Sequence, residues 1–141
     1  MHNQVQREAL AAALLTPGPL PADIAEQLRA GMRAWMLAGS DLPLPVCLGV
    51  PNTPAKARLA ARNHHLRGAA GHVAGTDTWQ TAKALAGAVQ RFNRRLWPAW
   101  CVLPDAPCYA TPLERALWQA RQAGDGPLPE TPQALRTVLG A

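Results

Sequence analysis

Side chains that could hold phosphate groups recur along one predicted helix, over residues 78–96. At about 100° per residue, four basic residues fall on one polar side of this helix: Lys83, Arg91, Arg94 and Arg95. The same spacing aligns Trp79 and Trp97 along one margin of that side. Arginine contacts phosphates and indole rings stack on bases, a combination found in proteins that bind single-stranded nucleic acid. The pattern therefore predicts a cationic strip edged by tryptophans; the alternative is a solvated helix face with both tryptophans at the core boundary.

The charge of the whole chain is concentrated around this helix. Residues 53–100 hold eight basic side chains against a single acid, Asp77, so this block has a net charge of +7. Residues 1–52 and 101–141 each have a net charge of −1. A concentrated cationic surface attracts polyanions, so we expect a nucleic acid or an acidic protein face as the partner.

A second predicted helix, over 54–74, supplies further basic residues to this block. Arg58, Arg62 and Arg67 are expected to support the cationic strip, with His65 and His72 on the same edge as Arg58 and Arg62. Protonation of the histidines below about pH 6.5 would strengthen the positive surface. The alternative is that these histidines are partly exposed and have no role.

Metal and catalytic chemistry find little support in the residue spacing. The ligand types are present, but His65 and His72 are seven residues apart, as are Cys101 and Cys108, where zinc sites favour closer pairs. The lone serine, Ser40, lacks a nucleophile-elbow context, and there is no phosphate-binding Gly-x-x-x-x-Gly-Lys loop. We therefore expect a non-enzymatic protein without a metal or cofactor.

The elements that position these residues are predicted to be helices throughout. Three Thr-Pro pairs, Thr53-Pro54, Thr111-Pro112 and Thr131-Pro132, are typical helix starts, and Glu114 completes a capping-box pattern with Thr111. We expect helices over these ranges: 3–15, Pro21 to Gly39, 54–74, 78–96 ending at Pro98, 112–123 and 132–139. The connector 39–52 is proline-rich, and its Val46–Val50 run could be a short extended piece.

These elements predict an all-α fold: a compact bundle of five or six short helices in a single domain, residues 1–141. The short connection between residues 74 and 77 favours a basic helical hairpin over 53–97 at its centre. Trp118 is expected in the core. The apolar stripes of the two basic helices are expected to be these residues: Ala55, Leu59, Leu66, Ala70 and Val73, then Ala82, Leu85, Val89, Phe92 and Leu96.

The location of the protein is constrained by what the chain lacks. No apolar run approaches the ~20 residues that cross a bilayer, and Met1-His2-Asn3-Gln4 does not open a signal peptide. Three cysteines without a Cys-x-x-Cys motif suit reduced thiols. We expect a cytoplasmic protein with no membrane partner.

Several short motifs resemble small helical proteins of proteobacterial prophages and integrative elements. They are Arg62-Asn63-x-x-Leu66-Arg67-x-Ala69-Ala70, Thr78-Trp79-Gln80, Val89-x-Arg91-Phe92 and Leu96-Trp97-Pro98. The likeness covers about residues 60–140 and implies an accessory role on a mobile element. It also raises the idea of a phage-borne antagonist of a host defence nucleoprotein.

Two hypotheses of function follow from these observations. The first is a basic accessory protein that binds DNA or RNA through the arginine-rich helix face, without a recognition-helix signature for sequence-specific reading. The second is a protein-interaction module whose Arg/Trp surface docks on an acidic or RNA-containing host defence complex, or on a second copy of the chain. Binding to phosphates weakens steeply with salt, whereas a packed protein interface need not.

Overall fold

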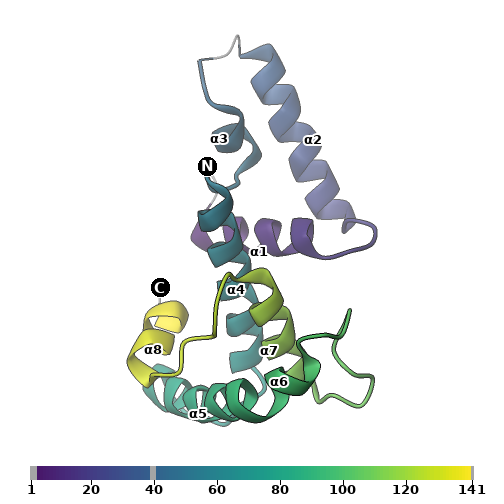
Figure 1. The fold of residues 1–141 in the computed structure, drawn as a ribbon. Helices are drawn as coiled ribbons and strands as arrows, with labels where there is room; N and C mark the ends of the chain where they lie inside the picture. The colour runs from purple at the N-terminus through teal and green to yellow at the C-terminus, as the bar shows by residue number, and fades with distance from the viewer. Residues whose placement is uncertain (1–2, 39–40, 141) are drawn as a thin grey trace. The chain divides into compact units, whose positions relative to one another are not determined.

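Helices form every regular element among residues 3–38 and 41–140, the part of the chain that the computed structural model describes. Figure 1 shows their order along the chain. Their bounds are α1 Gln4–Leu15, α2 Ala22–Leu37, α3 Leu44–Leu48, α4 Pro54–Ala70, α5 Thr78–Arg91, the π-helical turn η1 Phe92–Leu96, α6 Trp97–Trp100, α7 Pro112–Ala123 and α8 Pro132–Gly140. The predicted all-α class is confirmed. Counting the unbroken run α5–η1–α6 as one helix, the described residues form seven helical stretches, more than the five or six expected.

The predicted helix starts are confirmed by their caps. The Oγ1 atoms of Thr53, Thr111 and Thr131 each accept a hydrogen bond from the backbone amide three residues ahead, at 3.1–3.2 Å. At α7 the Glu114 carboxylate accepts in return from the Thr111 amide at 2.9 Å, which completes the capping box. Asp77 caps α5 by accepting from the Gln80 amide at 2.8 Å.

The connector contains a short helix where an extended piece was considered. Residues Leu44–Leu48 form α3, and Pro45 stands in its first turn, where a missing amide proton costs nothing. Gly49 ends the helix with φ +76°, a left-handed conformation that glycine adopts without strain. The interpretation of Val46–Val50 as extended was wrong because a proline in the first turn and a glycine stop four residues later suffice for one helical turn.

Pro98 does not end the helix that begins at Thr78. The chain continues through η1 into α6, and the Trp97 amide donates to the Phe92 carbonyl, an i→i+5 bond. Pro98 then falls in the first turn of α6, a position that tolerates a residue without an amide proton. The π turn thus lets a proline follow a helix directly, and the non-helical segment before α7 begins only after Trp100.

The chain divides into two compact units, which we call the N-terminal unit (residues 1–61) and the C-terminal unit (residues 62–141). In the N-terminal unit, α2 packs against α3 at the buried Gly31. A Cβ atom at Gly31 would lie 2.5 Å from the Cys47 carbonyl oxygen and 3.0 Å from the Leu48 Cα atom. Glycine is therefore what allows the two helices to approach so closely.

The C-terminal unit holds one hydrophobic core, built by α4, η1 and every helix from α5 to α8. Its largest fully buried side chains are Leu66, Leu85, Phe92, Leu117, Leu128 and Leu135. Trp118 is buried in it, as expected. Leu59 and Ala55 were wrongly assigned to the stripe, since Leu59 is 47% exposed and the core covers α4 only from Leu66 onward.

The connection between α4 and α5 is a corner and not the expected hairpin. Figure 1 shows α5 running across the end of α4 and not back along it. α8 packs on α5 instead, so that two elements far apart in the sequence lie together. Separately, none of the helices in the described part of the chain is long and apolar enough to span a bilayer.

Candidate functional site

The four basic residues of the predicted strip all lie exposed on α5 and η1. Lys83 and Arg91 belong to α5, and Arg94 and Arg95 to η1. Within residues 3–38 and 41–140, none of the four makes an ion pair or a side-chain hydrogen bond with another protein group. Their positive charges therefore remain available to an external partner. We call these four residues the cationic strip.

The π turn changes the register of the tryptophans. An i→i+5 turn takes up one extra residue, so each later residue lags about 100° behind its place in an uninterrupted α-helix. Trp97 consequently faces the core side, where its ring centroid is 6.1 Å from that of Phe92. It is half-buried, and the Arg121 guanidinium covers its ring at 4.7 Å. Trp97 therefore packs beside the core and does not align with Trp79.

Trp79 is the tryptophan that stays at the surface, with 41% of its area exposed. The Arg136 guanidinium carbon of α8 lies 5.8 Å from its ring centroid, within the range of a cation–π contact. Arg136 is exposed as well, and so adds a positive charge beside the first turn of α5. Sequence reasoning missed Arg136, because it lies in a nearly neutral flank and meets α5 only through the packing of α8.

The supporting arginines of α4 are less available than those of the cationic strip. Arg58, Arg62 and Arg67 are all half-buried, and Arg58 lies in the N-terminal unit. Arg62 donates from Nε and Nη2 to the Asn63 Oδ1 atom, at 3.2 and 2.8 Å, and burial lowers its pKa.

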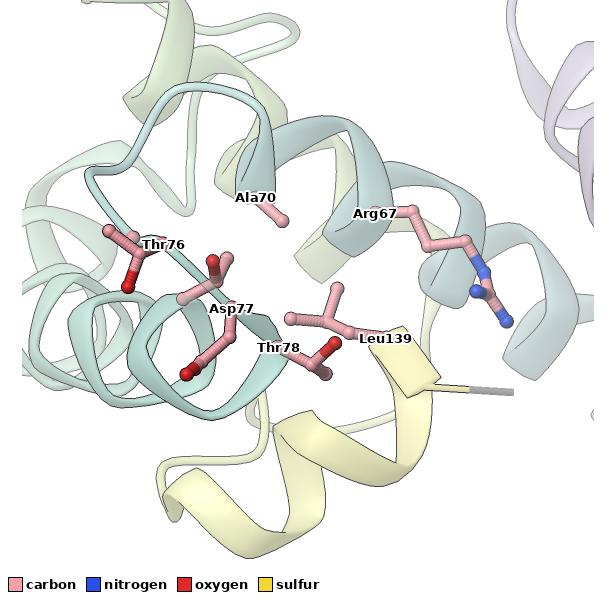
Figure 2. A pocket seen from close by; sticks show the side chains of 8 residues that line it. Arg67, Ala70, Thr76, Asp77, Thr78 and Leu139 are labelled. Carbon is pink, nitrogen blue, oxygen red and sulfur yellow. The ribbon is translucent and has the colours of Figure 1, made fainter.

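Arg67 lines a hollow of about 410 Å³ at the corner between α4 and α5. Figure 2 shows Thr76, Asp77 and Thr78 on its α5 side, with Leu139 of α8 opposite and the Arg67 guanidinium directed away from Asp77. The Asp77 carboxylate already caps α5, and it would repel an anion placed there. The hollow therefore does not offer a second phosphate site.

His65 does not strengthen the positive surface in the way expected. Burial, and secondarily the neighbouring His64, lower the pKa of His65 to about 4. His65 is consequently neutral near pH 6, where the expectation required it to become charged. As for metal ligands, no group of three His, Cys, Asp or Glu side chains that could hold an ion occurs among the described residues.

The site is thus an exposed row of cations with one surface tryptophan at its start. Known proteins add nothing to this geometry: no family model matches the chain, and neither a curated protein nor a solved structure is significantly similar to it.

Proposed function

We propose that this chain is a non-enzymatic, basic accessory protein of a phage or mobile element that binds nucleic acid through the cationic strip. The observation that carries the proposal is the exposure of Lys83, Arg91, Arg94 and Arg95 without a protein partner in the described part of the chain. The resemblance to prophage and integrative-element proteins supplies the accessory role, and we place the protein in the cytoplasm of the host cell.

The length of the cationic strip suits a run of phosphates. Lys83 to Arg95 spans about 18 Å along a helix axis, which equals the axial rise of about five base pairs. Arginine side chains can hold phosphates in bidentate fashion, and π-helical turns recur at functional sites. Contacts of this kind position a nucleic acid without reading its sequence, so we expect binding with little sequence preference.

Fluorescence anisotropy of labelled single- and double-stranded DNA and RNA, titrated at 50 and 200 mM salt, tests the proposal. Four phosphate contacts predict a log–log salt slope of about −3.6 on a duplex and about −2.8 on a single strand. Affinity should then fall about 150-fold and about 50-fold, respectively, across that range.

The site assignment is tested by R91A/R94A/R95A, which removes three charges from the cationic strip and keeps good helix formers. We expect the log–log salt slope of this variant to become shallower, with a magnitude of about 1 or below, while its circular dichroism spectrum stays unchanged. The matched control is R29A/R33A/K56A, which removes three exposed charges elsewhere and gives the same net charge of +2. Equal loss in the two variants would show that net charge alone matters, and no binding by the parent protein at 50 mM salt would end the proposal.

A second candidate function is docking on an acidic or RNA-containing host defence complex. The observation that favours it is the exposed apolar surface at the end of α2, where Met36 is 71% and Leu37 is 74% exposed. Methionine is enriched at protein interfaces, and binding through such residues would persist at 200 mM salt. Salt-resistant binding that M36E/L37E removes would support this function over the first.

A further inference from the structure

A groove runs between α4 and α7 in the C-terminal unit, away from the cationic strip. Residues from both sides line it: His64, His65 and Gly68 of α4, His72 just beyond the C-terminal end of α4, and Pro112, Arg115, Ala116 and Gln119 of α7. Its volume is about 420 Å³, which lies within the range of pockets that hold small organic ligands. The proposed function makes no use of this groove.

Arg115 supplies the fixed positive charge of the groove. One of its Nη2 protons is donated to the Pro107 carbonyl at 3.1 Å, which holds the half-buried guanidinium in place. A guanidinium has five N–H donors, so four remain after this bond. The groove lining contains no carboxylate that could neutralise the charge. Arg115 is therefore placed to receive an anionic group.

Two further polar side chains in the groove make no hydrogen bond to another protein group among the described residues. Gln119 and His65 are half-buried, and within the described residues neither side chain makes a hydrogen bond. The lowered pKa keeps His65 neutral at pH 7, so that it offers one N–H donor and one acceptor. Together with Arg115, these groups offer more donors than the two oxygens of a carboxylate use. They suit the three strong acceptor oxygens of a phosphate monoester.

Gly68 leaves room for a larger group beside this phosphate position. A Cβ atom placed on Gly68 would meet nothing within 4 Å, so the α4 side of the groove is open there. The adjoining His64 and His65 rings meet edge to face, with centroids 5.4 Å apart, and provide flat surfaces for a planar ring. The groove thus combines a place for an anion with a place for a ring.

We propose that the α4–α7 groove binds a nucleoside monophosphate, with the phosphate at Arg115 and Gln119 and the base over Gly68 and the histidine rings. The ligand is either a free nucleotide or the terminal nucleotide of a strand, since both carry the same chemistry. This binding is separate from the cationic strip, and it does not depend on the proposed function.

The test is a titration of the ¹⁵N-labelled full chain, followed by NMR, with adenosine monophosphate, ribose 5-phosphate, adenosine and inorganic phosphate. We expect adenosine monophosphate to shift resonances of α4 and α7 with a Kd of about 1 mM or tighter, and each partial ligand to bind at least about tenfold more weakly. Adenosine or inorganic phosphate binding as tightly as the nucleotide would overturn the proposal, as would the absence of shifts with both the free nucleotide and a 5′-phosphorylated dinucleotide. Shifts with a 5′-phosphorylated dinucleotide but not with the free nucleotide would assign the groove to a strand terminus.

Gly68→Leu tests the location by filling the groove without removing a donor. It should weaken adenosine monophosphate binding at least about tenfold, while Gly87→Leu, an equally open glycine on α5, should leave it unchanged. If Gly68→Leu fails to fold, Gln119→Leu is the second variant, with the same expected loss. Unchanged binding by a folded groove variant would overturn the proposal. R91A/R94A/R95A should retain nucleotide binding, which separates failure of this site from failure of the cationic strip.

Discussion

His65 shows how partial burial sets the charge of a single residue. Its half-buried ring lines the α4–α7 groove, where desolvation disfavours the protonated form and His64 adds a smaller effect in the same direction. Because its folded-state pKa is about 4 and its ordinary value is 6.5, the unfolded chain takes up a proton at a higher pH than the folded chain. Protonation of His65 therefore favours unfolding.

The stability of the protein should fall in a pH window that this residue defines. Above pH 6.5 His65 is neutral in both states and contributes no pH dependence; between pH 6.5 and about 4 it lowers stability, and below that the loss levels off. After allowance for solvent screening, we expect the parent to lose about 1–2 kcal/mol more than His65→Gln between pH 7 and 4.5. Urea unfolding of both proteins at the two pH values measures this, and parallel losses would contradict it.

Two glycines should respond in opposite ways to the same substitution. Gly31→Ala would place a methyl group against the backbone of α3, which cannot yield without separating the helices, so we expect a net loss of about 1–3 kcal/mol. Gly87→Ala meets nothing within 4 Å and should stabilise α5 by about 0.5–1 kcal/mol. Denaturant unfolding followed by circular dichroism compares the two; equal effects would mean that α2 and α3 do not approach as closely as described.

At the scale of elements, the π turn η1 is the feature that sets which side chains near the end of α5 face the core and which face solvent. It rotates Trp97 onto Phe92 while leaving Arg94 and Arg95 exposed. A π turn is in effect a one-residue insertion, so removing one residue from it restores an α-helix without rotating the flanking segments. The same deletion within α5 would turn half of its buried stripe away from the core.

Deletion of Arg94 should therefore be tolerated, while deletion of Gly87 should not. With Arg94 removed, Trp97 follows Phe92 at four residues and stays on the same face, so we expect cooperative unfolding within about 2 kcal/mol of the parent. With Gly87 removed, the residues before it, including Leu85 and Ala82, rotate by about 100° relative to the rest, and the core should not form. Thermal unfolding of both deletion variants, followed by circular dichroism at 222 nm, tests this prediction. Loss of cooperative unfolding in both variants would show that the π turn is required for folding.

At the scale of the whole molecule, the hydrophobic core and the positive charge reside in the same part of the chain. The core cluster lies entirely between Leu66 and Val138. Residues 53–141 carry eleven basic against five acidic side chains, a net charge of +6. Folding and binding should both depend on this part.

A fragment of residues 53–141, which keeps the Thr53 cap of α4, should fold alone and bind nucleic acid with a salt slope within about 20% of the parent's. Residues 1–61 alone should lack a cooperative transition, because their buried side chains are few and mostly alanines. Calorimetry of both fragments tests whether each one folds, and fluorescence anisotropy of fragment 53–141 tests its binding to nucleic acid. A fragment 53–141 that unfolds without a heat-capacity peak would place part of the core contribution in residues 1–52.

Much of the fold could be predicted because its signals are local. The Thr-Pro caps, the Asp77 cap and the apolar repeat of Ala82, Leu85, Val89 and Phe92 act within a few residues, so α5, α7 and α8 begin where the sequence indicates. The exposure of the four residues of the cationic strip follows from the same repeat, which turns the opposite face of α5 outward.

By itself, the sequence determined the helical class, the helix starts and the outward row of Lys83, Arg91, Arg94 and Arg95. Only the tertiary structure decided three features. Arg136 contacts the ring of Trp79, and Trp97 packs against Phe92. His65, Arg115 and Gln119 line one groove. The physical reason is range: capping and helical periodicity act over one or two turns, whereas these contacts depend on how distant helices pack and on one π turn that shifts the register between them.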